Sequence, residues 1–308
     1  MNAQGIVTAL LPILSLILLG LALKQIRFIP DEAWAGMERL TYFLLFPALL
    51  IHTLGRQRLD GIPWLEILAV VVAVLLLASL LLVIGFKLFA AVSGATFTSI
   101  FQGGIRFNTY IALALAQAFF GNQGLAMGAV MAGFMIVLIN LLCISVLSVW
   151  GSGRAVRRGG LMRDVISNPL ILACLIGWGL SLSGIGLPGP SEEILEIVGR
   201  AALPFGLLAV GAALRPRALH GHLGPILVSS LVQFGVKPLA TAGMIILTGL
   251  GGPAAGVLVI AFMTPTASSA YILARQLGGD TETMASIITL QTLLAFLVMP
   301  LIAYLMLS

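Results

Sequence analysis

The residues with the clearest chemical potential lie in two short polar segments inside otherwise apolar sequence. The first, QGGIRFNTY (102–110), places an arginine and an asparagine in the middle of a long hydrophobic run. The second, MTPTASSAY (263–271), contains a proline with hydroxyl residues on both sides. Charged and amide side chains are costly at membrane depth, so where they occur there they indicate a functional site.

Arg106 is the most informative single residue of the chain. An arginine near the bilayer midplane costs about 2.5–3.5 kcal/mol on insertion scales. One hypothesis is that its charge balances an anionic substrate, with a carboxylate as the simplest candidate. The other is that its guanidinium caps backbone carbonyls or pairs with a neighbouring side chain. We favour the anion site.

Both polar segments are expected to interrupt a helix. Gly103 and Gly104 weaken the helical hydrogen-bond ladder, and Asn108 is a good N-cap for a second half-helix. Pro265 removes a hydrogen bond from the other helix. Two half-helix N-termini would then meet, each carrying about half a positive charge. The alternative is that these residues only kink tightly packed helices.

The predicted substrate site combines the two segments. Its residues are Arg106, Asn108, Thr109, Tyr110, Thr266, Ser268 and Ser269. Three more polar residues either support this site, line an ion site or form interhelical hydrogen bonds: Gln102, Asn140 and Gln291. Lys237 either supports this site or an ion site from the eighth helix or snorkels toward the membrane surface. Acidic residues fall only near helix ends, which argues against an antiporter built on a buried carboxylate pair. The coupling ion, H⁺ or Na⁺, stays open.

The composition places these segments in a membrane protein. Of 308 residues, 60% are apolar and 9% are charged, against about half and about a quarter in soluble domains. The mean hydropathy is +1.13. These values nearly exclude soluble enzymes and nucleic-acid-binding proteins, and they make the lipid bilayer the main partner. Because no phosphate-binding, zinc or nucleophile motif is apparent, we predict neither an enzyme nor a cofactor or metal site.

A helix needs about 20 residues to cross the hydrocarbon core. Candidate spans are 5–23, 36–54, 64–86, 95–120, 124–150, 168–187, 195–214, 225–249, 254–277 and 283–307. We therefore predict an all-α integral membrane protein with ten transmembrane helices in one domain, residues 1–308. The polar segments fall in the fourth and ninth of these helices.

Basic residues are distributed unequally between the connections. Counted from an outside N-terminus, the odd-numbered connections contain Lys24, Arg27, Lys87, Arg154, Arg157, Arg158, Arg163, Arg215, Arg217 and Arg275. The even-numbered connections contain only Arg56 and Arg58. Since cytoplasmic connections are enriched in lysine and arginine, we expect both termini outside a cytoplasmic (inner) membrane. The basic connection 151–167 is then cytoplasmic.

The two halves of the chain resemble each other weakly. At an offset of 157 residues, prolines align at 12 and 169 and at 47 and 204, and glycines at 20 and 177. Near the end of each half, Tyr110 aligns with Tyr271. Five helices in 1–150 and five in 168–308 give two inverted repeats, an arrangement common among secondary transporters. Chance matching is the alternative explanation.

With these segments in view, the chain resembles the auxin efflux carrier family in its short bacterial form. The resemblance is carried by LTYFLLFPALLIHTL (40–54), RFNTYIALALA (106–116), the basic connection and MTPTASSAYILARQLGGD (263–280). It covers nearly the whole chain. Plant members have Asn-Pro-Asn-Thr-Tyr where this chain has RFNTY (106–110), so only the last three residues match.

The resemblance implies a secondary transporter with a scaffold of helices 1, 2, 6 and 7 and a mobile unit of helices 3–5 and 8–10. It also implies crossed helices 4 and 9, an elevator motion and homodimers joined through the scaffold. The same fold occurs in bile acid–sodium symporters, so a sodium-coupled organic-anion symporter is one alternative. A membrane ligand sensor that does not transport is another, and a channel is a third. We predict a transporter of a small organic anion.

Overall fold

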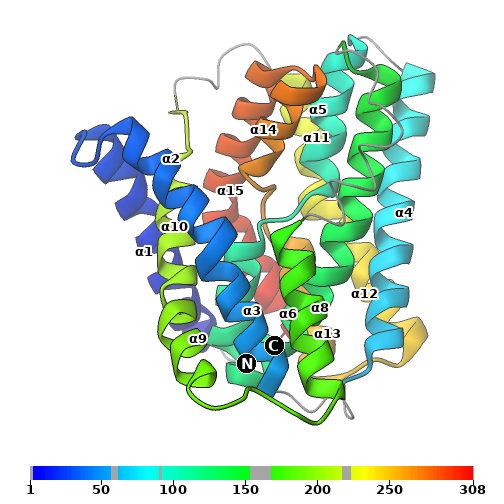
Figure 1. The fold of residues 1–308 in the computed structure, drawn as a ribbon. Helices are drawn as coiled ribbons and strands as arrows, with labels where there is room; N and C mark the ends of the chain where they lie inside the picture. The colour runs from blue at the N-terminus through cyan, green and yellow to red at the C-terminus, as the bar shows by residue number, and fades with distance from the viewer. Residues whose placement is uncertain (1–2, 57–61, 90–91, 153–167, 217–222, 308) are drawn as a thin grey trace.

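Helices account for nearly all of the chain that can be described, and none of it forms a strand. The structure is a computed structural model in which residues 3–56, 62–89, 92–152, 168–216 and 223–307 are described. Figure 1 shows a helical bundle with both chain termini at the same end.

The helices follow one another in chain order. In the first half they are α1 (Ala3–Gln25), α2 (Asp31–Leu40), the π-helix η1 (Thr41–Leu45), α3 (Phe46–Arg56), α4 (Trp64–Phe89), α5 (Gly94–Ile105) and α6 (Thr109–Trp150). In the second half they are α8 (Pro169–Leu182), α9 (Ser191–Arg200), α10 (Ala202–Ala212), α11 (Leu223–Leu231), the π-helix η3 (Val232–Val236), α12 (Lys237–Thr248), α13 (Gly252–Met263), α14 (Ser269–Leu277) and α15 (Thr281–Leu307).

The predicted class, an all-α membrane protein, is confirmed. Among the described residues, 7 helical stretches are long and apolar enough to cross a membrane, and α8 and α13 are shorter apolar helices. One stretch, Gly94–Trp150, covers two predicted spans. Within it Gly121 has φ 60° and ψ −148°, which divides α6 between the predicted spans 95–120 and 124–150. Glycine tolerates this positive φ because it has no Cβ.

Some predicted boundaries differ from the observed ones. The sixth span was expected to reach residue 187, but α8 ends at Leu182. Gly184 and Gly186 follow with φ of 71° and 65°, and this left-handed backbone ends the helix although the sequence stays apolar. The basic connection 151–167 lies outside the described residues beyond Ser152, as do Arg58 and Arg217.

Each π-helix is followed closely by a proline. The π-helix η1 ends at Leu45, two residues before Pro47, and η3 ends at Val236, two residues before Pro238. Proline lacks an amide hydrogen and its ring crowds the carbonyl four residues earlier, so the preceding turn widens. Tyr42 of η1 lines the cavity described below, and Gln233 of η3 is fully buried.

Close helix contacts depend on glycine. A Cβ on Gly20 would lie 2.1 Å from the Leu208 carbonyl oxygen, and one on Gly211 would lie 1.9 Å from that of Ile17. These glycines let α1 pack directly on α10. Gly177 has the same function between α8 and α3, since a Cβ there would lie 2.8 Å from Leu54 Cβ.

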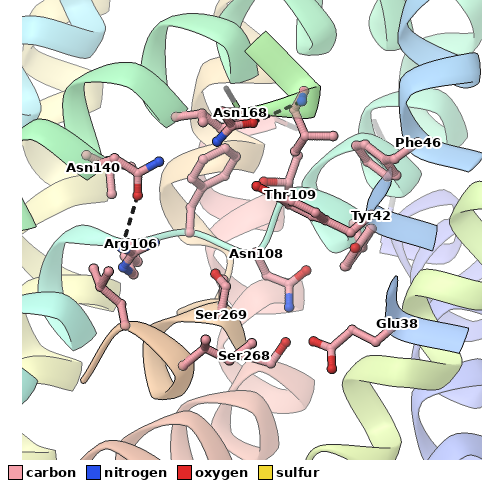
Figure 2. Close-up of a pocket in the computed structure, with 18 of the residues that line it drawn as sticks. Glu38, Tyr42, Phe46, Arg106, Asn108, Thr109, Asn140, Asn168, Ser268 and Ser269 are labelled. Atoms are coloured by element: carbon pink, nitrogen blue, oxygen red, sulfur yellow. Dashed lines mark hydrogen bonds between the residues drawn. The ribbon is translucent and has the colours of Figure 1, made fainter. Parts of the chain in front are cut away.

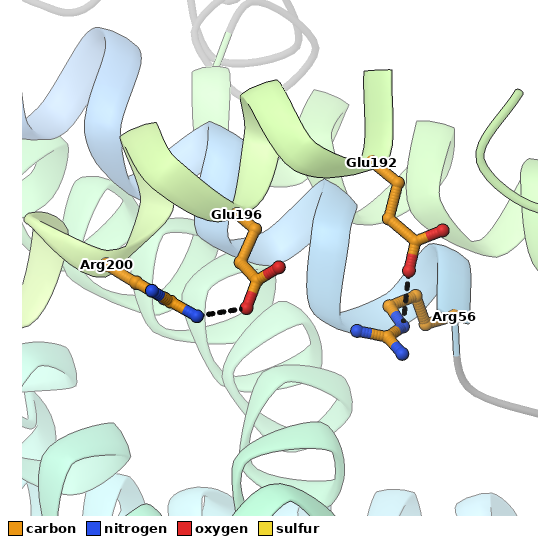
Figure 3. Close-up of polar contacts among 4 residues, drawn as sticks. All are labelled: Arg56, Glu192, Glu196 and Arg200. Atoms are coloured by element: carbon orange, nitrogen blue, oxygen red, sulfur yellow. Dashed lines mark hydrogen bonds and ion pairs between the residues drawn. The ribbon is translucent and has the colours of Figure 1, made fainter. Parts of the chain in front are cut away.

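Ion pairs add to this packing at the surface. Arg56 Nε of α3 lies 3.0 Å from Glu192 Oε1 of α9, as Figure 3 shows. On α9 itself, Arg200 Nη2 lies 2.5 Å from Glu196 Oε1. Both pairs are largely exposed, so each contributes at most about 1 kcal/mol in water. Their main effect is to balance the charge of two arginines locally.

Candidate functional site

Both helix interruptions expected from the sequence are present, but the first begins later than predicted. The chain leaves the helix between Ile105 and Thr109, so Gly103 and Gly104 remain helical. A Cβ on Gly103 would lie 2.6 Å from Ile287 Cγ2, and one on Gly104 would lie 3.0 Å from Leu82 Cδ1. These two glycines therefore permit close packing and do not unwind the helix.

The second interruption falls where it was predicted. The helix α13 ends at Met263, α14 begins at Ser269, and Pro265 lies in the extended segment between them. The two interruptions are in contact, because the Thr266 hydroxyl donates to the Gln102 carbonyl oxygen at 3.3 Å. Segments that are far apart in sequence therefore meet inside the bundle.

A cavity of about 620 Å³ opens where the interruptions meet. Its volume is in the range of small-molecule sites. Helices α2 and α3, the α5–α6 segment, α6, and the starts of α8 and α14 form its walls (Figure 2). Its polar lining residues are Glu38, Arg39, Tyr42, Arg106, Asn108, Thr109, Tyr110, Asn140, Asn168, Ser268, Ser269 and Gln276.

Arg106 lies at the wall of this cavity and is only 7% exposed. Its Nε donates to Gln102 Oε1 and its Nη2 donates to Asn140 Oδ1, each at 3.1 Å. Both partners are neutral amides, and within the described ranges no carboxylate forms an ion pair with Arg106. The amides hold the guanidinium in place but leave its charge uncompensated.

Two half-helices begin at the cavity. Asn108 is the N-cap of α6, and its Oδ1 accepts a hydrogen bond from the Ile111 amide at 3.1 Å, as the sequence predicted. Thr109 opens α6 and Ser269 opens α14, and both line the cavity. Helix N-termini carry partial positive charge. Together with Arg106, they make this wall attractive to an anion.

Other residues predicted for the site lie behind this wall. Thr266, Gln102, Gln291 and Lys237 are fully buried and do not line the cavity. Gln291 holds both interruptions, because its Oε1 accepts from the Thr266 amide at 3.1 Å and its Nε2 donates to the Gly103 carbonyl at 3.0 Å. These residues shape the site and do not form its surface.

Sequence reasoning missed part of the opposite wall. Glu38 and Tyr42 come from α2 and η1, and Asn168 caps α8 through hydrogen bonds from the amides of Leu170 and Ile171. Figure 2 shows Glu38 on the far side of Asn108 from Arg106. The proline after Asn168 was a signal for a helix start. The sequence pattern does not predict that Glu38, Tyr42 and Asn168 lie near the two polar segments.

A second, smaller cavity adjoins the first. It measures about 330 Å³ and shares Glu38 and Ser268 with the first cavity. Two basic residues, Lys24 and Arg215, and two acidic residues, Asp31 and Glu38, line its wall. Lys24 pairs with Asp31 at 2.6 Å, and the Arg215 guanidinium lies 4.7 Å from the centre of the Tyr271 ring. The basic and acidic side chains of this second cavity are therefore equal in number.

Comparison with known proteins gives three matches. A family described as "Membrane transport protein" matches residues 154–303. An "Uncharacterized transporter" of Methanothermobacter thermautotrophicus is 24% identical over 302 residues, which is 97% of this chain and 97% of the relative. A "Putative malonate transporter" of Rhizobium meliloti is 25% identical over 297 residues, 92% of this chain and 91% of the relative.

Proposed function

We propose, from the premise that this chain is a transporter of the auxin efflux carrier family and not an enzyme, that it moves a small organic anion across the cytoplasmic membrane. The substrate is a carboxylate, bound in the cavity where the two interrupted helices meet. It crosses by alternating access, with the cavity exposed first to one side of the membrane and then to the other.

The observation that carries this proposal is the setting of Arg106. A guanidinium that is 7% exposed, held by two neutral amides and paired with no carboxylate among the described residues, needs an anion to balance it. A carboxylate accepts two parallel hydrogen bonds from a guanidinium and therefore fits it well. The N-termini of α6 and α14 supply further partial positive charge at the same wall.

We also propose the ten-helix, inverted-repeat topology as the frame of this site. The packing supports it. In the proposed repeats α1 corresponds to α8, and α3 corresponds to α10. The contact of α1 with α10 is therefore the counterpart of the contact of α8 with α3. Gly20 and Gly177, which align in the two halves of the sequence, each lie at one of these contacts. In this topology both termini are outside and the basic connections are cytoplasmic.

An elevator motion of two rigid groups fits this packing. The helices α1, α2, α3, α8, α9 and α10 form one group, the scaffold, with homodimers joined through it. The remaining helices form the moving unit, in which α5 packs on α11 and α15, α6 on α13, and α4 on α12. The cavity lies between these groups, because α2, η1 and the start of α8 face both interruptions across it.

Ligand-induced thermal stabilisation tests the proposal. We expect mono- or dicarboxylates to raise the melting temperature of the detergent-purified protein, since a ligand at a hundred times its Kd stabilises the folded state by about 2.7 kcal/mol. Malonate belongs in the panel because one relative is named for it. Arg106→Gln should remove the shift, whereas Arg56→Gln, which alters an exposed surface arginine, should retain it.

Two further outcomes separate the alternatives. A folded protein that no carboxylate stabilises, or an Arg106→Gln variant that binds as well as the wild type, contradicts the anion site. Counterflow in proteoliposomes then distinguishes a carrier from a sensor or channel, because only a carrier accelerates labelled uptake when unlabelled substrate is trapped inside. Uptake that requires a sodium gradient would favour the sodium-coupled symporter.

A further inference from the structure

Lys237 lies at the centre of the buried polar network and has no place in the cavity wall. It is the first residue of α12, directly after the π-helix η3, and it is fully buried. Its ammonium donates to the carbonyl oxygens of Ile105 and Arg106 at 3.3 and 3.2 Å. It also donates to Gln233 Oε1 at 2.7 Å. These oxygens account for all three of its hydrogens.

The three oxygens come from a place where negative partial charge accumulates. Ile105 is the last residue of α5, so its carbonyl lies at the negative end of a half-helix. Gln233 extends the same function to the second interruption, because its Nε2 donates to the Thr264 carbonyl at the end of α13. The Lys237–Gln233 pair therefore caps the ends of both half-helices at once.

The remaining side of the ammonium is also occupied. The Phe262 ring centre lies 5.7 Å from Lys237 Nζ, within the range of a cation–π contact. Carbonyl and amide oxygens around one point are the ligands that hard cations such as sodium prefer. In this protein the Lys237 ammonium already occupies that point, and the surrounding oxygens accept hydrogen bonds from it.

We propose that Lys237 is a built-in cation that takes the place of a dissociable metal ion where the interrupted helices cross. It fixes the C-terminus of α5 and so positions the following residue, Arg106, whose carbonyl it also binds. The anion carrier therefore binds its substrate without sodium. The second statement rests on the proposed transport function, whereas the first concerns the folded protein alone.

The test measures melting temperature in chloride salts of sodium, methylammonium and choline at one ionic strength. We expect the wild type to melt at the same temperature in all three salts. Lys237→Ala should melt several degrees lower in choline and recover part of this loss in sodium or methylammonium, which can enter the vacated space. Lys237→Met fills that space without charge and should stay low in every salt. Lys87→Ala, an exposed lysine at the end of α4, is the control for loss of a charge.

A wild type that is stabilised by sodium over choline overturns the proposal, as does a Lys237→Ala variant that no cation restores. Where neither variant can be purified folded, the wild type decides: equal carboxylate-induced shifts in sodium and choline support the proposal, and a sodium requirement overturns it. If no carboxylate binds in any salt, the transport function fails, but the cation response of the variants still tests the role of Lys237.

Discussion

Asn108 combines two functions in one side chain. Its Oδ1 caps α6, and the residue lies at the cavity next to the proposed anion site. The cap is a local interaction over three residues, which is why the sequence alone predicted it. Because the acceptor oxygen serves the helix, the amide nitrogen is the part of Asn108 suited to a substrate carboxylate.

Substitutions at Asn108 should separate these functions. Asn108→Ala loses the cap, so we expect a loss of about 0.5–2 kcal/mol in stability, seen as a lower melting temperature. Asn108→Asp keeps an acceptor at the cap but adds negative charge to the cavity. It should retain most of the wild-type melting temperature and lose the carboxylate-induced shift. If the Asn108→Asp variant binds carboxylates as well as the wild type, the anion binds away from Asn108.

At the residue scale, the sequence could not predict which side chains contact Arg106 or face it across the cavity. Arg106 was identified from its charge and depth alone, but its partner Asn140 lies 34 positions further along the chain, within α6. Glu38 and Asn168 reach the cavity only because α2 and α8 pack beside the interruptions. Contacts of this kind depend on how helices pack, which hydrophobic periodicity does not specify.

At the scale of helices, the two interruptions differ in cause. Pro265 ends α13 by chemistry that is visible in the sequence. The paired glycines gave a misleading signal, since Gly103 stays helical and allows Ile287 and Ser229 to approach. A glycine in an apolar segment permits either unwinding or close contact, and only the neighbouring helix decides which occurs.

Gly103→Ala tests the packing function. Its Cβ would lie 2.6 Å from Ile287 Cγ2 and 3.1 Å from Ser229 Cβ, so α15 or α11 must shift. We expect a cost of about 1–3 kcal/mol, measured as a lower melting temperature. The double variant with Ile287→Ala should melt higher than the sum of the single effects predicts. Gly85→Ala is the control, because nothing lies within 4 Å of its added Cβ. If Gly103→Ala is as stable as this control, Gly103 serves to unwind the helix and not to permit close packing.

At the scale of the whole molecule, ion pairs lie at both ends of the bundle. At the end opposite the chain termini, where α1 is followed by α2 (Figure 1), Lys24 of α1 pairs with Asp31 of α2. At the terminal end, Arg56 is matched by Glu192. Hydropathy and charge count were enough to predict the helical class, since both depend on composition. The inverted pairing of the halves depends on contacts between them, and it stays a prediction.

Cysteine labelling tests the predicted orientation. Phe28→Cys lies in the connection between α1 and α2, and Ser183→Cys in that between α8 and α9; both positions are exposed. We expect a membrane-impermeant maleimide to label position 183 in intact cells and position 28 only after permeabilisation. The native Cys143 and Cys174 are buried, so background labelling is low. The reverse pattern would invert the topology.

If the proposed elevator motion carries the two buried cations across the membrane, transport should be sensitive to membrane voltage. Arg106 and Lys237 are the only charged side chains among the buried residues of the described chain, and both belong to the proposed moving unit. One elementary charge crossing the membrane is worth about 2.3 kcal/mol per 100 mV. In the predicted orientation, a potential that is negative inside would draw the empty moving unit toward the cytoplasm. A bound dianion cancels that charge, so voltage would govern the return of the empty carrier and leave the loaded step nearly untouched.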